Sequence, residues 1–546
     1  MHDHHPEPGS DREREVFLSL QTRLEPMFRE VYADPLAERT VVVIPGLSLD
    51  QETLAHIAGA PHYEERQLSM LMLLRLPRTR VIFVTSTPVD PVIIDYYLSL
   101  LSGVPSGHAR RRLTLLSAYD SSARSLTSKI LARPRLLQRI RDAIGDPATA
   151  HLSCFNATAD EVALAVRLGV PLYACDPALA RFGTKSGSRR AFRDAGVPLP
   201  DGTEELRSID ELHGALAALK RRNPELRRAA IKLEEGFSGE GNAVFDFGEI
   251  DTDAVVPAWI EREMPLRLAP EAAGLSAEQY LAKFARMGGV AEAWLEGEDK
   301  RSPSVQMRIT PIGTLEIIST HDQLLGGHSG QVFLGSTFPA DARYRGSLQA
   351  AGARVGEILR NHGVLGRFSV DFITVREGET WKHHAIEINL RKGGTTLPFQ
   401  MLQFLTAGHY DPERCEFLTP TGQVRAYYAT DNLCRPEYRR LTPDDLVDLI
   451  VEHRLHFDPT HQRGVVFNLI GALSEFGKLS LVSIADTHEH AEDLYRRTVA
   501  VISLARFQPA ATRAFLEFVR ERREELQKMA EGHPQGDEPK PGARRR

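Results

Sequence analysis

FSVDFITVREGETWKHHAIEINLRKGG, residues 368–394, carries the strongest structural signal in the chain. Two runs of alternating apolar residues flank a turn that contains Gly378, a pattern typical of an antiparallel hairpin. Side chains alternate along a strand, so Glu387, Asn389 and Arg391 project to one face. Asp371 shares that face if the two strands pair. The apolar neighbours indicate a well-packed sheet, and an exposed polar face on an edge hairpin is the alternative.

The polar residues of this hairpin predict a cation site. A hydrophobic core does not favour two carboxylates and an amide carbonyl beside an arginine, because buried like charges are costly without a counter-ion. Oxygen ligands without His or Cys favour a hard cation such as Mg²⁺. We therefore expect Asp371, Glu387 and Asn389 to bind a metal ion.

A glycine-rich segment, KLEEGFSGEGN (232–242), follows a predicted strand that contains Lys232. Glycines let backbone N–H groups surround an anion, and a nearby ammonium adds positive charge. The segment therefore predicts phosphate contact, with a plain flexible turn as the alternative. Lys185 lies in a different setting, GTKS (183–186), where Ala178 replaces the first glycine of a P-loop, so a P-loop is excluded.

A third segment, VAEAWLEGED (290–299), combines a short apolar stretch with acidic residues on both sides. Its backbone could pair with an adenine edge, and a carboxylate could accept hydrogen bonds from ribose hydroxyls. A strand end followed by a surface loop is the alternative.

The N-terminal part of the chain alternates β-branched runs with helical segments, which predicts an α/β domain with a parallel sheet. Helical periodicity occurs over residues 64–77 and 160–169. VVVIPG is not part of a G-x-G-x-x-G motif, so dinucleotide binding there is not expected. The expected strands are VVVIPG (41–46), RVIFVTS (80–86), HLSCFNAT (151–158) and PLYACD (171–176).

The rest of the chain contains more antiparallel signal. Gly-containing turns predict hairpins over 229–247 and 307–319, in addition to the one at 368–390. A mixed C-terminal block follows, with strands expected at 465–470 and 479–485 and a helix near 489–505. Together these patterns predict a multidomain chain of the α/β and α+β classes.

Composition excludes several classes of function. A chain of 546 residues is too long to form a single hydrophobic core, and its length suggests three or four domains of about 150 residues. Lys+Arg 67 against Asp+Glu 73 gives a net charge of −6, which favours binding neither to nucleic acid nor to a membrane surface. No run of 18 apolar residues occurs, and the N-terminus lacks a signal-peptide pattern. Four scattered cysteines favour a cytoplasmic protein with buried thiols.

Taken in order, these segments resemble the ATP-grasp enzymes over about residues 183–400. Over about 41–505 the chain resembles more closely the carboxylate–amine ligases of the pheganomycin type, which are peptide ligases. The segments that carry this likeness are VVVIPG, GTKSGSRRAFRDAGV (183–197), EINLRKGGTTLPF (387–399), YYATDNL (427–433) and GVVFNLIGALSEFGK (464–478). The chain departs from that subgroup at Leu397 and Asn468, where histidines are typical.

The resemblance implies an ATP-grasp fold with an N-terminal Rossmann-like pre-ATP-grasp domain and a C-terminal mixed α/β domain. The expected divisions are a flexible tail (1–14), the pre-ATP-grasp α/β domain (15–182), the ATP-grasp domain (183–400, with a lid subdomain at about 190–290), the C-terminal α/β domain (401–520) and a disordered tail (521–546).

The resemblance also implies residue roles. Lys185 and Lys232 correspond to the two nucleotide lysines near the α- and β-phosphates, and Arg391 to the cation near the transferred phosphoryl group; Lys232 and Arg391 are the expected catalytic residues. Glu298 is favoured over Asp299 for the ribose. The expected lid residues over the triphosphate are Gly236, Ser238, Gly239, Glu240, Gly241 and Asn242; those of the adenine hinge are Glu292, Ala293, Trp294 and Leu295; the Mg²⁺ ligands are Asp371, Glu387 and Asn389.

The implied activity is ATP-dependent ligation of a small carboxylate to an amine, such as an amino acid or peptide, through an acyl phosphate, with release of ADP and phosphate. Two Mg²⁺ ions are expected, with Mn²⁺ as a substitute, and a homo-oligomer is compatible. His321 and His328 are candidate bases for the amine, with structural or exposed loop histidines as the alternative. Competing functions are an ATP-grasp kinase or ATPase that forms no amide, and a catalytically idle ATP-binding regulator.

Overall fold

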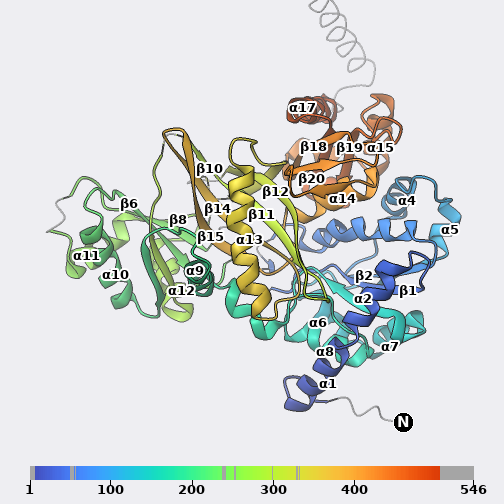
Figure 1. Cartoon of the computed structure of the whole chain (residues 1–546), viewed down its shortest axis with the longest axis horizontal. Helices are drawn as coiled ribbons and strands as arrows, with labels where there is room; N and C mark the ends of the chain where they lie inside the picture. Colours follow the sequence, from blue (N-terminus) through green and yellow to red (C-terminus); the bar gives the residue numbers. More distant parts are fainter. Residues whose placement is uncertain are drawn as a thin grey trace, which may run out of the picture.

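The computed structural model describes residues 6–49, 54–55, 57–236, 241–250, 254–272, 274–297, 299–326, 330 and 332–504. Within these residues the strands form three sheets, which have four, five and eleven strands (Figure 1). The predicted segments 1–5 and 521–546 lie outside the described residues. Helix α1 (Asp11–Gln21) begins inside the predicted tail 1–14, because Ser10 caps it and Arg14 pairs with Asp176 at 2.6 Å.

The four-stranded sheet is parallel, in the order β3 (Leu113–Ser117), β2 (Thr79–Thr85), β1 (Arg39–Ile44), β4 (Ala150–Cys154). Alternate residues of β1 enter two different cores, Val41 and Val43 on one face and Val42 and Ile44 on the other. This two-sided burial explains the continuous apolar runs of the sequence. The helices around it are α2 (Leu24–Ala33), α4 (Pro91–Ser99), α5 (Ser106–Arg110), α6 (Leu126–Leu131), α7 (Pro134–Ile144), α8 (Ala159–Leu168) and the helical segment η1 (Ala60–Arg75).

Three of the four strands expected here are confirmed, and the expectation for 171–176 is wrong. That segment makes a single bridge, Leu172 to Leu152, and then leaves the sheet. Asp176 accepts a hydrogen bond from the Ala178 N–H and so begins a new helical turn, η3 (Pro177–Gly183). The fourth strand is β3, whose side chains are mostly half-buried and give a weak apolar pattern.

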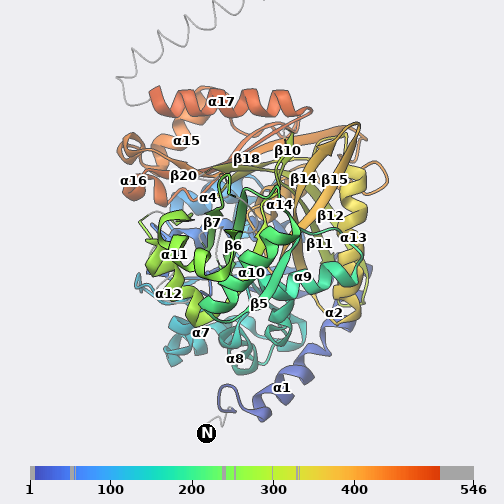
Figure 2. The same ribbon diagram turned by 90° about the vertical axis from the view of Figure 1, so that its left-hand side faces the viewer.

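The five-stranded sheet is antiparallel, in the order β5 (Gly202–Leu206), β9 (Gly289–Ala293), β6 (Arg228–Leu233), β7 (Asn242–Asp246), β8 (Leu268–Pro270). The predicted hairpin at 229–247 is its β6–β7 pair. One apolar core joins the sheet to the helices α10 (Ile209–Arg222), α11 (Pro257–Arg267) and α12 (Ala277–Met287) (Figures 1 and 2). Helix α9 (Lys185–Asp194) begins at Lys185 with Thr184 as its cap.

The eleven-stranded sheet contains both remaining hairpins and runs on into the C-terminal part of the chain. α13 (Arg345–Asn361) packs on β11 and β12 because Gly352 has no side chain: a Cβ there would lie 2.9 Å from Val305 Cβ. The sheet path is β10 (Lys300–Arg301), β14 (Gly366–Glu377), β11 (Pro303–Ile309), β12 (Leu315–Gly326), β13 (Val332–Phe338), β18 (Val424–Cys434), β17 (Glu416–Leu418), β16 (His409–Asp411), with β15 (Thr380–Asn389) on β14, β20 (Lys478–Ala485) on β18 and β19 (Gly464–Asn468) on β20.

The C-terminal strands are covered by α14 (Thr396–Thr406), α15 (Pro443–Glu452), α16 (Ala472–Phe476), the turn η5 (Pro436–Arg440) and α17 (His488–Leu504), and Figure 2 shows α17 across β18 and β20. The predicted strands at 465–470 and 479–485 and the helix near 489–505 are confirmed. One core joins Val41 of β1 to Tyr427 of β18 and Val466 of β19, so the N-terminal sheet packs on the C-terminal block. The domain boundaries at 182 and 400 stay predictions. Across the described ranges, no helix has the length and apolar character of a membrane span.

Candidate active site

A cavity of about 890 Å³ lies between the five-stranded and eleven-stranded sheets. It gathers residues from segments that are distant in the sequence. Gly236 and Gly241 are not among its lining residues, and Ser238, Gly239, Glu240 and Glu298 lie outside the described residues. The predicted site residues that line it are Lys185, Lys232, Asn242, Glu292, Ala293, Trp294, Leu295, Asp371, Glu387, Asn389 and Arg391.

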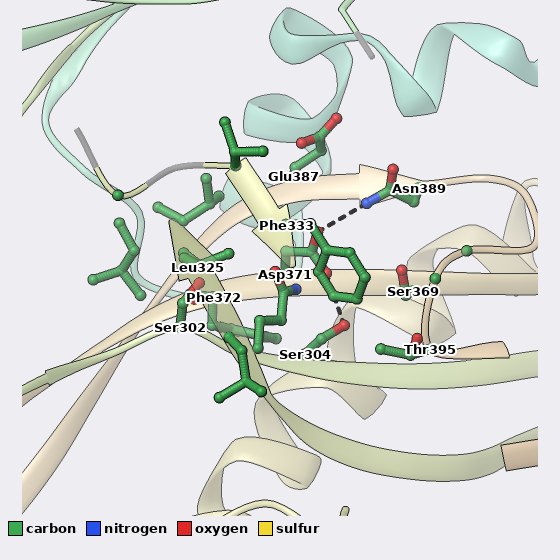
Figure 3. Close-up of a pocket in the computed structure, with 18 of the residues that line it drawn as sticks. Ser302, Ser304, Leu325, Phe333, Ser369, Asp371, Phe372, Glu387, Asn389 and Thr395 are labelled. Atoms are coloured by element: carbon green, nitrogen blue, oxygen red, sulfur yellow. Dashed lines mark hydrogen bonds between the residues drawn. The ribbon is translucent and has the colours of Figure 1, made fainter. Parts of the chain in front are cut away.

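Asp371, Glu387 and Asn389 lie together on the β14–β15 hairpin, as the alternation of the sequence predicted. Asp371 is directly opposite Glu387 in the strand register. Its carboxylate accepts a hydrogen bond from Asn389 Nδ2 at 2.9 Å and from the Ser304 hydroxyl at 2.7 Å (Figure 3). Burial and the neighbouring Glu387 raise the pKa of Asp371 to about 6. The two carboxylates therefore repel each other, and a nearby cation would stabilise both in the ionised form.

Lys185 supplies part of that charge. It is the first residue of α9, and its ammonium pairs with the Glu387 carboxylate. Burial opposes ionisation of Glu387, yet the Lys185 ammonium lowers its pKa. Glu234, directly after β6, holds the start of α9 through the Ser186 N–H at 2.9 Å and the Ser186 hydroxyl at 2.7 Å. The five-stranded sheet thus positions Lys185 over the carboxylates of the other sheet.

Lys232 belongs to a buried ionic group on the five-stranded sheet. Its Nζ lies 2.6 Å from the carboxylate of Glu292, which also pairs with Arg189 of α9. The side chains are only 7%, 3% and 4% exposed, respectively, and the two cations lower the pKa of Glu292 against the effect of burial. Glu292 therefore anchors Lys232, a role that its place in the predicted adenine hinge did not suggest.

The backbone of the predicted hinge is partly occupied. The Ala293 N–H donates to the Asp201 carbonyl at 2.7 Å, and the Trp294 N–H donates to the Arg228 carbonyl at 3.1 Å. Of the backbone N–H groups of Ala293, Trp294 and Leu295, the one left as the predicted donor to an adenine edge is therefore that of Leu295. Asp299, the alternative ribose carboxylate, pairs with Arg301 at 3.0 Å and is not a lining residue of the cavity.

The loop after Asn389 carries Arg391 into the cavity and is held by the N-terminal sheet. The Arg391 guanidinium lies 5.8 Å from the Phe155 ring centre. Lys392 donates to Gln67 Oε1 at 2.6 Å and to the Ser153 hydroxyl at 2.9 Å. Burial lowers the pKa of Lys392 to about 8. Lys392 therefore positions the neighbouring Arg391 relative to η1 and β4.

His321 is not suited to act as a base. It is fully buried, its Nε2 is 2.6 Å from the Tyr427 hydroxyl, and its ring packs on Phe338. Burial lowers its pKa to about 3, so it stays neutral at physiological pH. The structural interpretation of His321 is confirmed, and His328 lies outside the described residues.

The comparisons with known proteins agree with this geometry. A family model described as IQCH-like, ATP-grasp matches residues 177–273 and 275–413, and the PGM1 C-terminal domain model matches 445–498. The L-propargylglycine–L-glutamate ligase of Streptantibioticus cattleyicolor is 30% identical over 492 residues, which cover 88% of this chain and 97% of that protein. The chain belongs to the ATP-grasp ligases.

One further sequence relative and one solved structure are also similar to this ATP-grasp ligase. The IQ motif-containing protein H of Danio rerio is 26% identical over 421 residues, which cover 68% of this chain and 39% of that protein. The crystal structure of N5-carboxyaminoimidazole ribonucleotide synthetase with ADP has a TM-score of 0.50 at 13% identity, covering 87% of this chain and 99% of that one. The second likeness concerns the fold alone. The predicted ATP-grasp fold is confirmed.

The donor set of the ATP-grasp ligase fits a divalent cation. In the part of the chain that the structure describes, no three His, Cys, Asp or Glu side chains are grouped to hold a metal. The site would thus rest on two carboxylates and the Asn389 amide, which are hard oxygen donors. Burial and the neighbouring Glu387 raise the pKa of Asp371, so a cation bound here would stabilise its ionised form.

Several site residues gave no signal in the sequence. Ser304 reaches Asp371 only through the β11–β14 register, and Arg189 meets Glu292 only in three dimensions. Arg66 and Asp431 also line the cavity and pair with each other, although 365 positions separate them. Leu397 and Asn468, the departures from the subgroup, are both buried and line no part of the main cavity.

Proposed function

We propose that this ATP-grasp ligase joins the carboxylate of one small molecule to the amino group of an amino acid or peptide, through an acyl phosphate. The observation that carries the proposal is the single cavity in which Lys185 and Lys232 face the Asp371, Glu387 and Asn389 set and Arg391. The name of the Streptantibioticus relative, which states two amino acids, supports amino acids as substrates.

The chemistry requires activation because a carboxylate has no adequate leaving group. A carboxylate oxygen attacks the γ-phosphorus of ATP, the bond to the β-phosphate oxygen breaks, and ADP leaves. The amine lone pair then attacks the acyl carbon, the carbon–oxygen bond to phosphate breaks, and the nitrogen loses a proton to become the amide. In this scheme Lys185 and Lys232 neutralise phosphate charge, and Arg391 stabilises the transferred phosphoryl group.

Asp371, Glu387 and Asn389 would hold the divalent metal, which we propose to be Mg²⁺, as two ions that Mn²⁺ can replace. When bound, such ions neutralise phosphate oxygens and orient them for in-line transfer. The proposed lid over the triphosphate is the segment 236–242, which ends at Asn242 at the start of β7 and of which 237–240 lie outside the described residues. A lid would exclude water, which would otherwise hydrolyse the acyl phosphate.

The nucleotide end of the site is proposed with the same reasoning. Ala293 to Leu295 would contact the adenine, and Glu298 the ribose. The four cysteines, none of them in a disulfide, support a cytoplasmic location. A homo-oligomer stays a prediction.

The test is ADP release over pairs of amino acids and short peptides, with product masses measured. An added mass equal to both substrates minus water is the expected product. Hydroxylamine trapping of the acyl phosphate separates a ligase from a kinase or ATPase. ADP release without hydroxamate or amide would favour the kinase or ATPase, and no ADP release with any pair would favour the idle regulator.

A further inference from the structure

One end of the cavity carries charged groups that the phosphoryl-transfer scheme does not use. Arg66 of η1 pairs with Asp431 of β18, and the two side chains are 12% and 15% exposed. The Arg66 guanidinium lies 4.1 Å from the Tyr63 ring centre, and Lys478 of β20 donates to the Tyr63 hydroxyl. All four residues line the cavity. They form a partly buried cluster with both signs of charge, which we call the Arg66–Asp431 cluster.

The Arg66–Asp431 cluster and the adjacent Gln67 contain donors that lack an acceptor. Within the described residues, Arg66 Nε and Gln67 Nε2 are buried and have no hydrogen-bond partner. Both residues also line a small adjoining cavity of about 20 Å³, which is room for one oxygen-sized group. An unpaired buried donor destabilises the protein, so this arrangement favours a ligand that brings acceptor oxygens. A carboxylate is such a ligand, and a guanidinium is its usual partner.

The acidic member of the cluster differs from Glu292 and Glu387, two other carboxylates of the cavity. Glu292 is held by Lys232 and Arg189, and Glu387 by Lys185. Asp431 instead pairs with Arg66, the residue whose remaining donor is unsatisfied. A ligand carboxylate on Arg66 would release Asp431 to receive a positive group. The cluster therefore complements a zwitterion, with one charge of each sign.

The cluster lies beside the phosphoryl-transfer end of the site. Gln67, the neighbour of Arg66, accepts a hydrogen bond from Lys392, the neighbour of Arg391. Asp431 follows Thr430, which pairs with Gly335 in the same sheet that carries Asp371 and Glu387. The amino group that attacks an acyl phosphate must lie next to Arg391, and a carboxylate that receives that group must be close by. Asp431 lines the same cavity as Arg391 and pairs with Arg66, the neighbour of Gln67.

We propose that the Arg66–Asp431 cluster binds the acceptor amino acid, with its α-carboxylate on Arg66 and its amino group on Asp431. This inference rests on the proposed ligase function and adds the class of acceptor, a free α-amino acid or the N-terminal residue of a short peptide whose carboxylate reaches Arg66. Tyr63 and Lys478 act as positioning residues for the guanidinium.

The experiment compares two reactions of the full-length enzyme with the acid and acceptor found by the ADP-release screen. Hydroxylamine reports activation of the acid without the acceptor, and amide formation reports both. Arg66→Gln and Asp431→Asn are each expected to lower amide formation at least tenfold more than hydroxamate formation, and to raise the acceptor KM at least tenfold. Arg110→Gln, which breaks the exposed Arg110–Asp95 pair, is the matched control and changes neither reaction.

A second measurement begins with the wild-type enzyme alone, where no folding defect of a variant can hide the answer. The wild-type enzyme should prefer an acceptor with a free α-carboxylate over its carboxamide at least tenfold in kcat/KM. Arg66→Gln should reduce that preference to about twofold or less.

Three outcomes would overturn the inference. Equal losses of hydroxamate and amide would place the cluster at the activated acid, while an unchanged acceptor KM or no preference against the carboxamide would remove it from acceptor binding. Neither ADP release nor hydroxamate from the wild-type enzyme with any acid would instead reject the proposed function together with this inference.

Discussion

Asp371 of β14 lies directly opposite Glu387 of β15, so two carboxylates meet across one register position of a buried hairpin. Burial, and to a smaller extent repulsion by Glu387, raise the pKa of Asp371 to about 6. Such a pair is costly for folding and useful only when a cation is bound. The arrangement is therefore a strong argument that the site is built for function.

Asp371→Asn should lower amide formation about 100-fold or more, because the site loses one of its two anionic oxygen ligands. The same change should leave the thermal unfolding midpoint equal or higher, because it removes a like-charge contact. Amide product and Tm are the measurements, and Ser304→Ala, which removes only the hydroxyl bond to Asp371, should cost far less activity. Near-wild-type turnover in Asp371→Asn and in Glu387→Gln would contradict the metal assignment.

Lys232→Met should weaken ATP binding and also destabilise the fold by about 3 kcal/mol, because it leaves the buried Glu292 with Arg189 as its remaining cation. Adding Glu292→Gln should recover part of the stability without recovering ATP binding. Urea unfolding and ATP titration measure the two effects separately. Arg190→Met, at the exposed pair with Glu205, is the control and should change stability by less than about 1 kcal/mol. An unchanged ATP affinity in Lys232→Met would mean that the glycine-rich segment is a plain turn.

Glu64→Gln should flatten the pH dependence of stability. The Glu64 carboxylate accepts two hydrogen bonds from Ser86, both at 2.6 Å, and burial raises its pKa to about 7. The folded chain therefore keeps a proton on Glu64 that the unfolded chain releases above pH ~4.3. The stability that this bound proton contributes is lost as pH rises through about 7.

A neutral glutamine does not titrate. At pH 8 the free energy of unfolding of Glu64→Gln should therefore be about 2 kcal/mol higher than that of the wild type, and at pH 5 the difference should be smaller. Urea midpoints at pH 5, 6, 7 and 8 provide the comparison. Glu225→Gln at an exposed position should follow the wild-type curve. Parallel curves for Glu64→Gln and the wild type would show that Glu64 titrates as an ordinary glutamate.

Lys392→Met should lower kcat about tenfold while the KM for ATP changes by less than about threefold, because Lys185 and Lys232 stay in place while Arg391 loses its support. Stability at pH 7 should not fall, since a buried ammonium with a lowered pKa is itself costly. Steady-state kinetics and Tm are the readouts, and Ser153→Ala, which removes one of the two acceptors, should have a smaller effect. A loss confined to the KM for ATP would contradict the positioning role.

The sequence was sufficient for features that depend on local alternation. The hairpin at 368–390, the shared face of Asp371, Glu387 and Asn389, and the pairing of β6 with β7 all follow from residues a few positions apart. The same reasoning failed at 171–176, where Asp176 starts a helical turn and ends the strand after one bridge. The local pattern of apolar residues does not reveal that a neighbouring residue caps a helical turn and so ends the strand.

Features that depend on tertiary contacts left no pattern. Arg66 and Asp431 meet because η1 and β18 share a core, and no spacing rule connects positions so far apart. The resemblance to the ATP-grasp enzymes implies that Glu292 belongs to the adenine hinge, and only the fold reveals that its side chain binds Lys232 and Arg189. The lid residues Ser238, Gly239 and Glu240 and the ribose carboxylate Glu298 stay predictions.

The eleven-stranded sheet has a consequence for engineering. Strand β13 pairs with β18, so the strands that carry Asp371 and Glu387 and the strand that carries Asp431 belong to one hydrogen-bonded sheet. A chimaera joined near residue 400 would break that pairing and expose the edge of β13 to aggregation. New substrate ranges should therefore be sought by substituting side chains around Asp431 and Lys478, or by exchanging the entire segment from β10 to β20, rather than by grafting a foreign C-terminal module.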